Sequence, residues 1–254
     1  MGDQHTAFGK QRLLPKESTR QCSADLESGC VKDVNRLQVN ATFPKAGIFS
    51  SNGQTIRNLR ETTIISISIT GVILAGGRSS RMGGEDKGLI LLNQRPLYRH
   101  VLDHLAGQVS TVIINANRHL DQYRQSGLQV ITDTLPDFQG PLAGMLAGLK
   151  AAGTSWIVFV PCDVPVFPAD LVARLWEGKG NADAAFAHSG ERDHPAFALL
   201  NRSLIPALED FLSRGERRVM LFFMQVHAAR VVFTARHPAF SNLNTPRDIA
   251  DWRQ

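Results

Sequence analysis

Apolar segments with the period of strands alternate with helix-like segments over residues 65–254, and this alternation limits the fold more than any other feature of the sequence. The most apolar segment is 156–160, and a run without a polar position is typical of a strand that is covered on both faces. Such strands belong to parallel sheets, whose crossover connections place helices on either side. The sequence therefore predicts an α/β fold, a Rossmann-like three-layer domain with a mainly parallel sheet.

The expected elements follow one another in the order that such a sheet requires. Strands are predicted at 64–74, 111–115, 128–132, 156–160, 184–187, 196–200 and 230–233. Helices are predicted from about residue 96, where proline suits a first turn, and at 142–152, 168–176, 204–213 and 246–252. In an open parallel sheet, ligands bind beyond the carboxyl ends of the strands, so functional side chains are expected in the loops after these strands.

Residues 1–64 lack this regularity. They are a polar mixture in which the few apolar residues recur at neither period 2 nor period 3.6. A segment of this kind cannot bury enough apolar surface to fold alone. We therefore predict a disordered N-terminal extension over 1–64 and one enzyme domain over 65–254.

Charge and cysteine content exclude several functions. The net charge is +5, but residues 1–64 carry nine Lys/Arg against six Asp/Glu, and the remaining residues carry nineteen against seventeen. A domain this close to neutral suits a phosphorylated small molecule better than a nucleic acid. The chain has three cysteines without disulfide or metal spacing, which indicates a reducing, cytoplasmic compartment. No apolar run reaches the roughly 20 residues of a membrane helix, so no membrane partner is expected.

A glycine-rich loop follows the first predicted strand, at residues 75–84. Glycines let backbone N–H groups approach phosphate oxygens, and three cations in or just after the loop (Arg78, Arg81 and Lys87) suit a polyphosphate. The loop has neither the Gly-Lys-Ser/Thr ending of a Walker A motif nor the spacing of a dinucleotide-binding fingerprint. The alternative is a solvated surface loop, which its position directly after a buried strand disfavours.

Polar side chains also follow three other predicted strands. Asn115 and Asn117 come at the end of the second, and an amide can pair with a base edge or a ribose. Asp133 follows the third strand, and Asp163 follows the fourth between two prolines. A carboxylate there is a candidate Mg²⁺ ligand beside phosphates. Each of these residues could instead cap a turn or a helix, and the residues alone leave that alternative open.

Taken in order, these segments resemble the nucleotidyltransferases that act on sugar phosphates and cofactor precursors. The signature is LAGGRSSRMG at 74–83 followed by Asp86-Lys87, and it is specific to the superfamily. Within that group the chain is similar to the molybdenum cofactor guanylyltransferases, through segments at 115–119, 140–145, 161–165, 190–195, 215–220 and 242–246. The resemblance covers about residues 70–252 and implies a fold of the nucleotide-diphospho-sugar transferase type.

The resemblance also implies roles for individual residues. The guanine nucleotide would be held by Leu74, Ala75, Gly76 and Gly77, with Lys87 on its phosphates. Asn115 and Asp133 would contact the base and the ribose, Asp163 would hold Mg²⁺, and Arg81 would act with Lys87 and Asp163 in catalysis. The pair Gly76-Gly77 fits the guanylyl members, because alanine before the second glycine would crowd a purine. The molybdopterin side would be lined by 192–194, Arg217, Arg218, Asn242 and Asn244.

The implied reaction is the transfer of GMP from GTP to the terminal phosphate of molybdopterin, with release of pyrophosphate. GTP and molybdopterin would be the substrates and Mg²⁺ the cofactor. Transient contact with proteins of molybdenum cofactor biosynthesis, or with the molybdoenzymes that receive the product, would follow. Two alternatives stay open: a cytidylyl or sugar-phosphate nucleotidyltransferase, and a non-catalytic GTP-binding module. The presence of both Lys87 and Asp163 disfavours the second, since a binding module needs no metal ligand at the α-phosphate.

Overall fold

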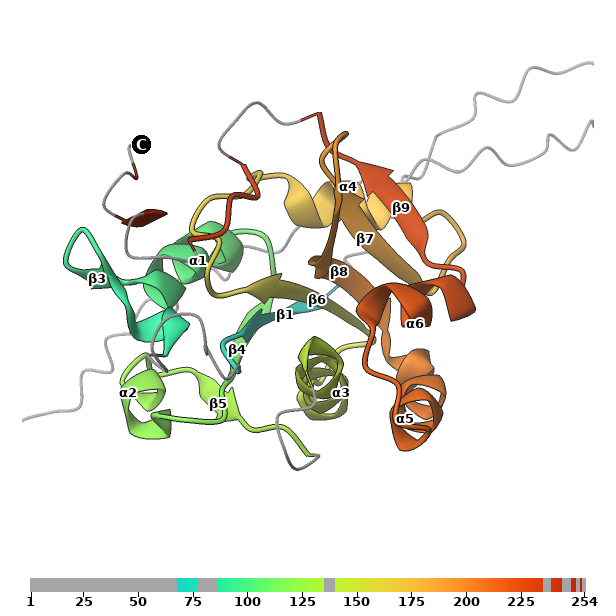
Figure 1. Cartoon of the computed structure of the whole chain (residues 1–254), viewed down its shortest axis with the longest axis horizontal. Coiled ribbons are helices and arrows are strands. Elements are labelled where there is room, and N and C mark those ends of the chain that lie inside the picture. The colour runs from blue at the N-terminus through green and yellow to red at the C-terminus, as the bar shows by residue number, and fades with distance from the viewer. Residues whose placement is uncertain are drawn as a thin grey trace, which may run out of the picture. The chain divides into compact units, whose positions relative to one another are not determined.

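The strands form one seven-stranded sheet in the computed structural model, which describes residues 68–76, 86–134, 140–234 and 239–243, together with residues 248, 249 and 252. The strand order across the sheet is β5-β4-β1-β6-β8-β7-β9 (Figure 1). The strand bounds are Ile69–Leu74 for β1, Thr111–Asn115 for β4, Gln129–Ile131 for β5, Trp156–Pro161 for β6, Ala184–His188 for β7, Asp193–Asn201 for β8 and Ala229–Val232 for β9. Within the described residues, β8 alone runs antiparallel to its neighbours in this sheet. The prediction of a mainly parallel sheet is confirmed.

Helices cover both faces of the sheet, and each face has its own core. One face carries α1, α2 and α4, and the other carries α3, α5 and α6 (Figure 1). The helix bounds are Leu97–Ala106 for α1, Leu120–Arg124 for α2, Pro141–Ala151 for α3, Leu171–Gly178 for α4, Ile205–Ser213 for α5 and Val219–Gln225 for α6. Consecutive residues of β6 point to opposite faces: Val158 and Val160 enter the first core, and Ile157 and Phe159 enter the second. The three-layer arrangement that the apolar strand predicted is therefore confirmed.

Local sequence explains where the helices begin. Helix α1 starts directly after Pro96, and Val101 and Leu105 lie one turn apart along the face that packs on the sheet. Helix α3 begins with Pro141, which has no N–H to leave unpaired in a first turn. Helix α4 starts at Leu171 rather than at the predicted residue 168. The strand predicted at 111–115 has those bounds in the structure.

The strand predicted at 196–200 is longer than the sequence indicated. It begins at Asp193 and includes Pro195. Proline is unusual inside a strand, because it cannot donate a ladder hydrogen bond. The structure accommodates Pro195 by a register shift, since Phe186 of β7 pairs with Ala198 and the next residue pairs with His194. The bulge places the start of β8 beside the carboxyl end of β7.

Two short helices and a hairpin were not predicted. Helix α2 has only five residues, and α6 is apolar on nearly every side, so neither shows a helical period. The hairpin joins β2 (Leu91–Leu92) to β3 (Arg95–Pro96) through Asn93 and Gln94, both in the left-handed region. Leu92 of this hairpin packs with Leu97 and Leu243 in a small third core.

Some predicted features lie outside the described residues. These are the extension 1–64, the first residues of the strand predicted at 64–74, and most of the helix predicted at 246–252. The division into an extension and a domain at residue 64 therefore stays a prediction. In the part of the chain that the structure describes, no helix is long and apolar enough to cross a membrane.

Candidate active site

The carboxyl ends of the four predicted strands meet at one edge of the sheet. In the strand register, Leu74 lies beside Asn115 on one side and beside Pro161 on the other. Backbone hydrogen bonds extend this alignment past the strands, because the Ala75 amide donates to the Asn115 carbonyl at 2.8 Å and the Cys162 amide donates to the Leu74 carbonyl at 3.1 Å. The glycine-rich loop and the polar residues after each strand therefore start from the same edge.

Asp163 and Lys87 meet at this edge from segments far apart in the chain. The Lys87 Nζ donates to the Asp163 Oδ2 at 3.0 Å, with the two side chains 25% and 11% exposed. Asn242 Nδ2 lies 3.4 Å from the other carboxylate oxygen, and the Leu243 amide donates to the Asp163 carbonyl at 2.8 Å. A residue that only caps its own turn would accept from neighbouring amides, whereas these partners come from two distant segments, at residue 87 and at residues 242–243.

The donor set around Asp163 fits Mg²⁺ held jointly with a substrate. Among the residues that the structure describes, no group of three or more His, Cys, Asp or Glu side chains could enclose a metal ion. Mg²⁺ seldom requires such a cage, because it is usually held by one or two carboxylates together with substrate phosphates and water. One carboxylate with a Lys ammonium at 3.0 Å is consistent with a site that phosphate oxygens complete.

A second polar group, on the other side of β1, joins the ends of β4 and β5. Both oxygens of Asp133 accept from amides: Asn115 Nδ2 donates at 2.9 Å and Asn117 Nδ2 at 2.8 Å. The Asp133 backbone N–H donates to Asn117 Oδ1 at 2.9 Å, so the two loops are locked together. A Cβ at Gly76 would lie 2.9 Å from Asn117 Nδ2. The close approach of Gly76 to this group is a structural reason for its lack of a side chain.

Asp86 forms a third polar group, which the sequence did not reveal. Its carboxylate is buried and accepts from the Tyr123 hydroxyl at 2.6 Å and from the Gly88 amide at 3.2 Å, with His119 Nδ1 at 3.2 Å. Burial, with a smaller contribution from the Asp86 charge, raises the pKa of Tyr123 well above its ordinary value, so the hydroxyl keeps its proton and donates. The available signal was the position of Asp86 directly before Lys87.

Cys162 lies between the site and the core. It is buried, and burial, followed by the neighbouring Asp163 charge, raises the pKa of its thiol well above the ordinary value. A thiol in this state does not act as a nucleophile. Cys162 is therefore a small buried residue of the first core.

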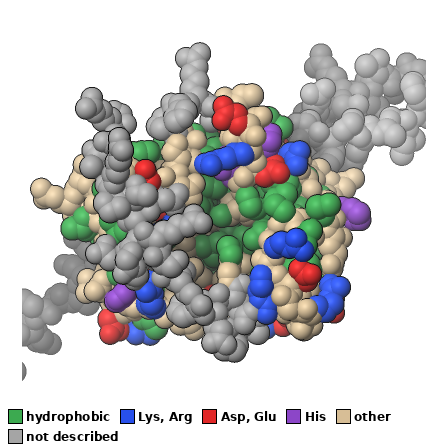
Figure 2. Space-filling view, viewed as in Figure 1, with side chains coloured by type: hydrophobic (Ala, Val, Ile, Leu, Met, Phe, Trp, Pro, Cys, Tyr) green, Lys and Arg blue, Asp and Glu red, His purple; other side chains and the backbone are tan. Residues whose placement is uncertain are grey.

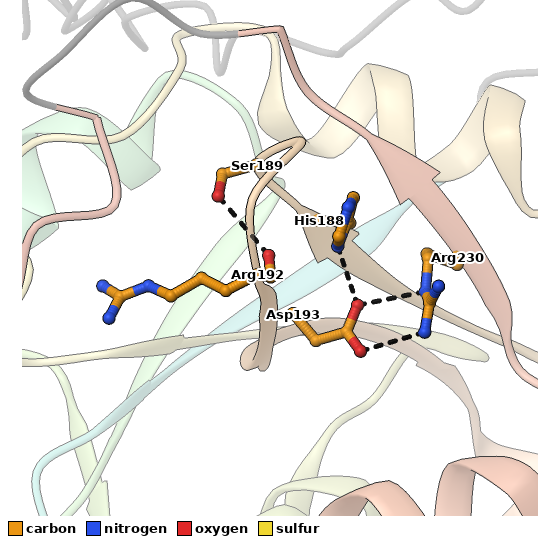
Figure 3. A network of polar contacts seen from close by, with 5 residues as sticks. All are labelled: His188, Ser189, Arg192, Asp193 and Arg230. Atoms are coloured by element: carbon orange, nitrogen blue, oxygen red, sulfur yellow. Dashed lines mark hydrogen bonds and ion pairs between the residues drawn. The ribbon is translucent and has the colours of Figure 1, made fainter.

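The residues predicted at 192–194 point in different directions at the start of β8. Asp193 accepts from Arg230 through both carboxylate oxygens at 3.0 Å, and His188 Nδ1 lies 2.9 Å from it (Figure 3). The Arg192 side chain extends to the opposite side (Figure 3). Its guanidinium donates to the Phe240 carbonyl at 3.4 Å. Asp193 thus ties β7, β8 and β9 together, while Arg192 contacts Phe240, which lies two residues before Asn242 in the chain.

The other residues assigned to the molybdopterin side do not form one group in the structure either. Arg217 donates to the backbone carbonyls of Leu212 and Glu216 at 2.8 and 2.6 Å, which is a structural role at the end of α5. Arg218 is largely exposed, and Asn242 is brought to Asp163. Asn244 lies outside the described residues. So do residues 77–84 of the glycine-rich loop, which include the candidate residues Gly77, Arg78 and Arg81.

Charges on the described surface are mixed. On the face shown in Figure 2, hydrophobic side chains gather in the middle, and Lys and Arg side chains around them alternate with Asp and Glu. A duplex nucleic acid requires a continuous basic stripe, and the described residues of this face carry charges of both signs instead.

His194 makes the stability of the protein depend on pH. Its ring stacks on Phe240 with 4.7 Å between centroids, and its Nε2 has no hydrogen-bond partner among the described residues. Burial, followed by the charges of Arg192 and His188, lowers the pKa of His194 from 6.5 to about 4. The unfolded chain therefore binds this proton at a higher pH than the folded one. The contribution of His194 to stability is complete above about pH 6.5 and is lost as the pH falls toward 4.

Between pH 7 and pH 5, this group should remove about 2 kcal/mol from the free energy of unfolding. His194→Phe keeps an aromatic ring against Phe240 and removes the titration. Urea unfolding of both proteins at the two pH values measures the effect. We expect the decrease to be smaller in the variant by about that amount, and an equal decrease in both proteins would contradict the assignment.

Comparisons with known proteins agree with this geometry. Residues 71–230 match the family model described as MobA-like NTP transferase domain. The chain is 56% identical over 186 residues to the molybdenum cofactor guanylyltransferase of Serratia proteamaculans, which covers 73% of this chain and 94% of that protein. It is also 56% identical over 187 residues to the protein of that name from Yersinia pestis (strain Pestoides F), covering 74% and 96%.

Solved structures share the fold at lower identity. The molybdopterin-guanine dinucleotide biosynthesis protein A of Archaeoglobus fulgidus aligns with a TM-score of 0.60 at 21% identity, covering 71% of this chain and 95% of that one. The 4-diphosphocytidyl-2C-methyl-D-erythritol synthase of Anaerococcus prevotii aligns with a TM-score of 0.59 at 11% identity, covering 72% and 93%. The fold alone therefore does not decide the base. On the family model and the identity of the relatives, the chain belongs to the molybdenum cofactor guanylyltransferases, in the MobA-like NTP transferase family.

Proposed function

We propose that this protein transfers GMP from GTP to the terminal phosphate of molybdopterin, releases pyrophosphate, and so forms the guanine dinucleotide form of the molybdenum cofactor. Nucleotidyl transfer in molybdenum cofactor biosynthesis follows from the family. The observation that carries the finer proposal is the Lys87–Asp163 pair at 3.0 Å, at the edge of the sheet that Asn115 and Asp133 also reach. We place the reaction in the cytoplasm, in transient contact with other proteins of cofactor biosynthesis or with the acceptor molybdoenzymes.

The chemistry of the substrates explains why so few reactive side chains are needed. The terminal phosphate of molybdopterin is already an anionic nucleophile, so it needs no strong general base. The difficulty is to bring two anions together and to balance the charge that develops on the α-phosphate and on the leaving pyrophosphate. Positioning of the reactants and fixed positive charge supply most of the rate enhancement in phosphoryl and nucleotidyl transfer.

Lys87 and Asp163 divide this task. The Lys87 ammonium would bind phosphate oxygens of GTP, and its contact with Asp163 fixes the direction of the side chain before the nucleotide enters. Asp163 would hold Mg²⁺, which when bound supplies a further positive charge beside the α-phosphate. Asn242, in contact with the Asp163 carboxylate, would keep that carboxylate oriented. Arg81 and the amides of the glycine-rich loop would complete the cradle for the phosphates.

The base would lie on the side of β4 and β5. Asp133 is held by two amides there, and a fixed carboxylate or carbonyl acceptor suits the ring N–H and amino group of guanine as well as ribose hydroxyls. A site that pairs with these donors leaves its own groups unpaired when cytosine enters. Discrimination by such unpaired groups reaches about 10⁴-fold.

Pyrophosphate release with defined substrate pairs tests the proposal. Purified protein with Mg²⁺, GTP and molybdopterin should release pyrophosphate at a rate at least about 100 times that with CTP. Turnover of CTP with molybdopterin at an equal rate would favour the cytidylyl alternative, and turnover of GTP with a sugar phosphate would favour the sugar-phosphate alternative. Binding of GTP without pyrophosphate release in any combination would favour a non-catalytic module.

A further inference from the structure

Asp86 is a buried carboxylate that the proposed reaction does not use directly. It is 6% exposed, and three groups surround it: the Tyr123 hydroxyl at 2.6 Å, the Gly88 amide at 3.2 Å and His119 Nδ1 at 3.2 Å. A carboxylate removed from water is stable only when such donors replace its hydration. With both oxygens engaged, the position of Asp86 is fixed relative to α2, which supplies Tyr123 and begins after His119.

The contact with the Gly88 amide connects this fixed carboxylate to Lys87. Asp86 is the N-cap of the 3-10 helix Lys87–Leu89, and its side chain accepts the amide of the second residue of that helix. Lys87 is the first residue of the same helix, so the cap sets the direction in which its side chain leaves the backbone. That side chain reaches Asp163, 76 residues away, at 3.0 Å.

Gly88 allows the arrangement, because a Cβ at that position would clash with the Tyr123 hydroxyl. His119 contributes from the other end of α2. Its backbone lies in the left-handed region at φ 48°, which is unfavourable for a residue with a side chain, and its carbonyl accepts from the Tyr123 amide at 3.3 Å. The strained residue and the first turn of α2 are thus both directed at Asp86.

We propose that Asp86 is a positioning residue that holds the Lys87 ammonium opposite Asp163. Asp86 acts through Lys87 and does not itself touch the substrate. The inference rests on the proposed function only for the role of Lys87 on the phosphates. Asp86 is also connected to the second polar group of the site, because the loop 115–119 pairs with Asp133 at one end and with Asp86 at the other.

Steady-state kinetics in two backgrounds test the proposal. Asp86→Ala removes the cap, and a displacement of Lys87 by about 1 Å should lower kcat for GTP and molybdopterin about 100-fold, with a smaller change in KM for GTP. Asp86→Asn retains an oxygen that accepts from Gly88 and Tyr123, so this variant should keep most of the wild-type kcat. When Lys87→Ala is already present, Asp86→Ala should change kcat less than twofold, because the residue through which it acts is absent.

Asp121→Ala is the matched control. Asp121 lies on α2, is almost fully exposed and pairs only with Arg124 among the described residues, so its removal should leave kcat unchanged. A loss of kcat on Asp86→Ala that is equally large in the Lys87→Ala background would overturn the proposal and leave Asp86 a structural residue. If Asp86→Ala does not fold, Tyr123→Phe removes one donor to the carboxylate and should still lower kcat several-fold, and an unchanged kcat would overturn the proposal.

A labelling measurement separates this proposal from the proposed function. The rate at which an N-hydroxysuccinimide ester acetylates Lys87, followed by peptide mass spectrometry, needs no substrate and no activity. Lys87 should react several times faster in Asp86→Ala and in Asp163→Asn than in the wild type, and at the wild-type rate in Asp121→Ala. Equal rates in Asp86→Ala and the wild type would refute the positioning role even if GTP is the substrate. Faster labelling in a protein that does not use GTP would refute the function alone.

Discussion

Asp163→Asn should lower turnover of GTP and molybdopterin by about 100-fold or more, the loss expected when one group that balances charge in the transition state is removed. The substitution keeps the size of the side chain and an oxygen that can accept from Asn242 or Lys87. It removes the negative charge that a hard cation requires. Steady-state rates against Mg²⁺ concentration should therefore show a lower maximum and a higher Mg²⁺ requirement than the wild type.

Thermal unfolding and a matched substitution make this result specific. The midpoint of unfolding should change little, because the Lys87 side chain is 25% exposed and its ammonium can be solvated when the carboxylate is gone. Asp103→Asn removes an exposed carboxylate that pairs with Arg95 and should leave both the rate and its Mg²⁺ dependence unaltered. An Asp163→Asn enzyme with a normal rate and a normal Mg²⁺ dependence would return Asp163 to a purely structural role.

Asp133→Ala should affect binding of the nucleotide more than the chemical step. It removes the acceptor for the side chains of Asn115 and Asn117, both of which are then free to turn away from the base. We expect KM for GTP to rise about 100-fold, kcat to fall much less, and the preference for GTP over CTP to shrink, since the groups that reject the wrong base are no longer fixed. Kinetics with both triphosphates measure all three quantities.

The cost to the fold should be visible as well. Asn115 is 2% exposed, and a buried amide without its acceptor costs about 1–3 kcal/mol of stability. Asp121→Ala, an exposed carboxylate on the neighbouring helix, serves as the control for loss of a charge alone. Unchanged discrimination between GTP and CTP in Asp133→Ala would show that the base is recognised elsewhere, and would leave nucleotidyl transfer unaffected.

The sequence predicted the parts of the site that depend on where strands end. The apolar run of β6 indicated that its end would lie at the functional edge, and the structure indeed places Asp163 there beside Lys87. The parallel pairing of β1 with β4 and β6 follows from the same pattern. What each of these residues binds came from the resemblance to a family rather than from the periodicity.

The sequence did not predict the contacts that depend on side chains from short elements. Tyr123 belongs to a helix of five residues, too short for a periodic pattern, and its hydroxyl reaches Asp86 from 37 residues away. Similarly, Arg192 and Asp193 are adjacent in the sequence and were assigned the same role, yet Arg192 lies in the turn before β8 and Asp193 is the first residue of that strand, and their side chains have different partners. Arg192 donates to the Phe240 carbonyl. Asp193 instead accepts from Arg230 (Figure 3).

The bridge between Asp193 and Arg230 has a consequence for association between molecules. Among the strands that the structure describes, β9 ends the sheet order, and it pairs with β7 along its four residues. Unpaired backbone groups on an edge strand can recruit a strand from another molecule, and a short edge with a charged residue resists this. Arg230 supplies that charge in the middle of β9. Asp193 holds the Arg230 guanidinium in place, and the guanidinium stays exposed to water. The same ion pair that ties three strands together therefore also holds a charged residue on β9, and we expect this charge to disfavour pairing with a strand of another molecule.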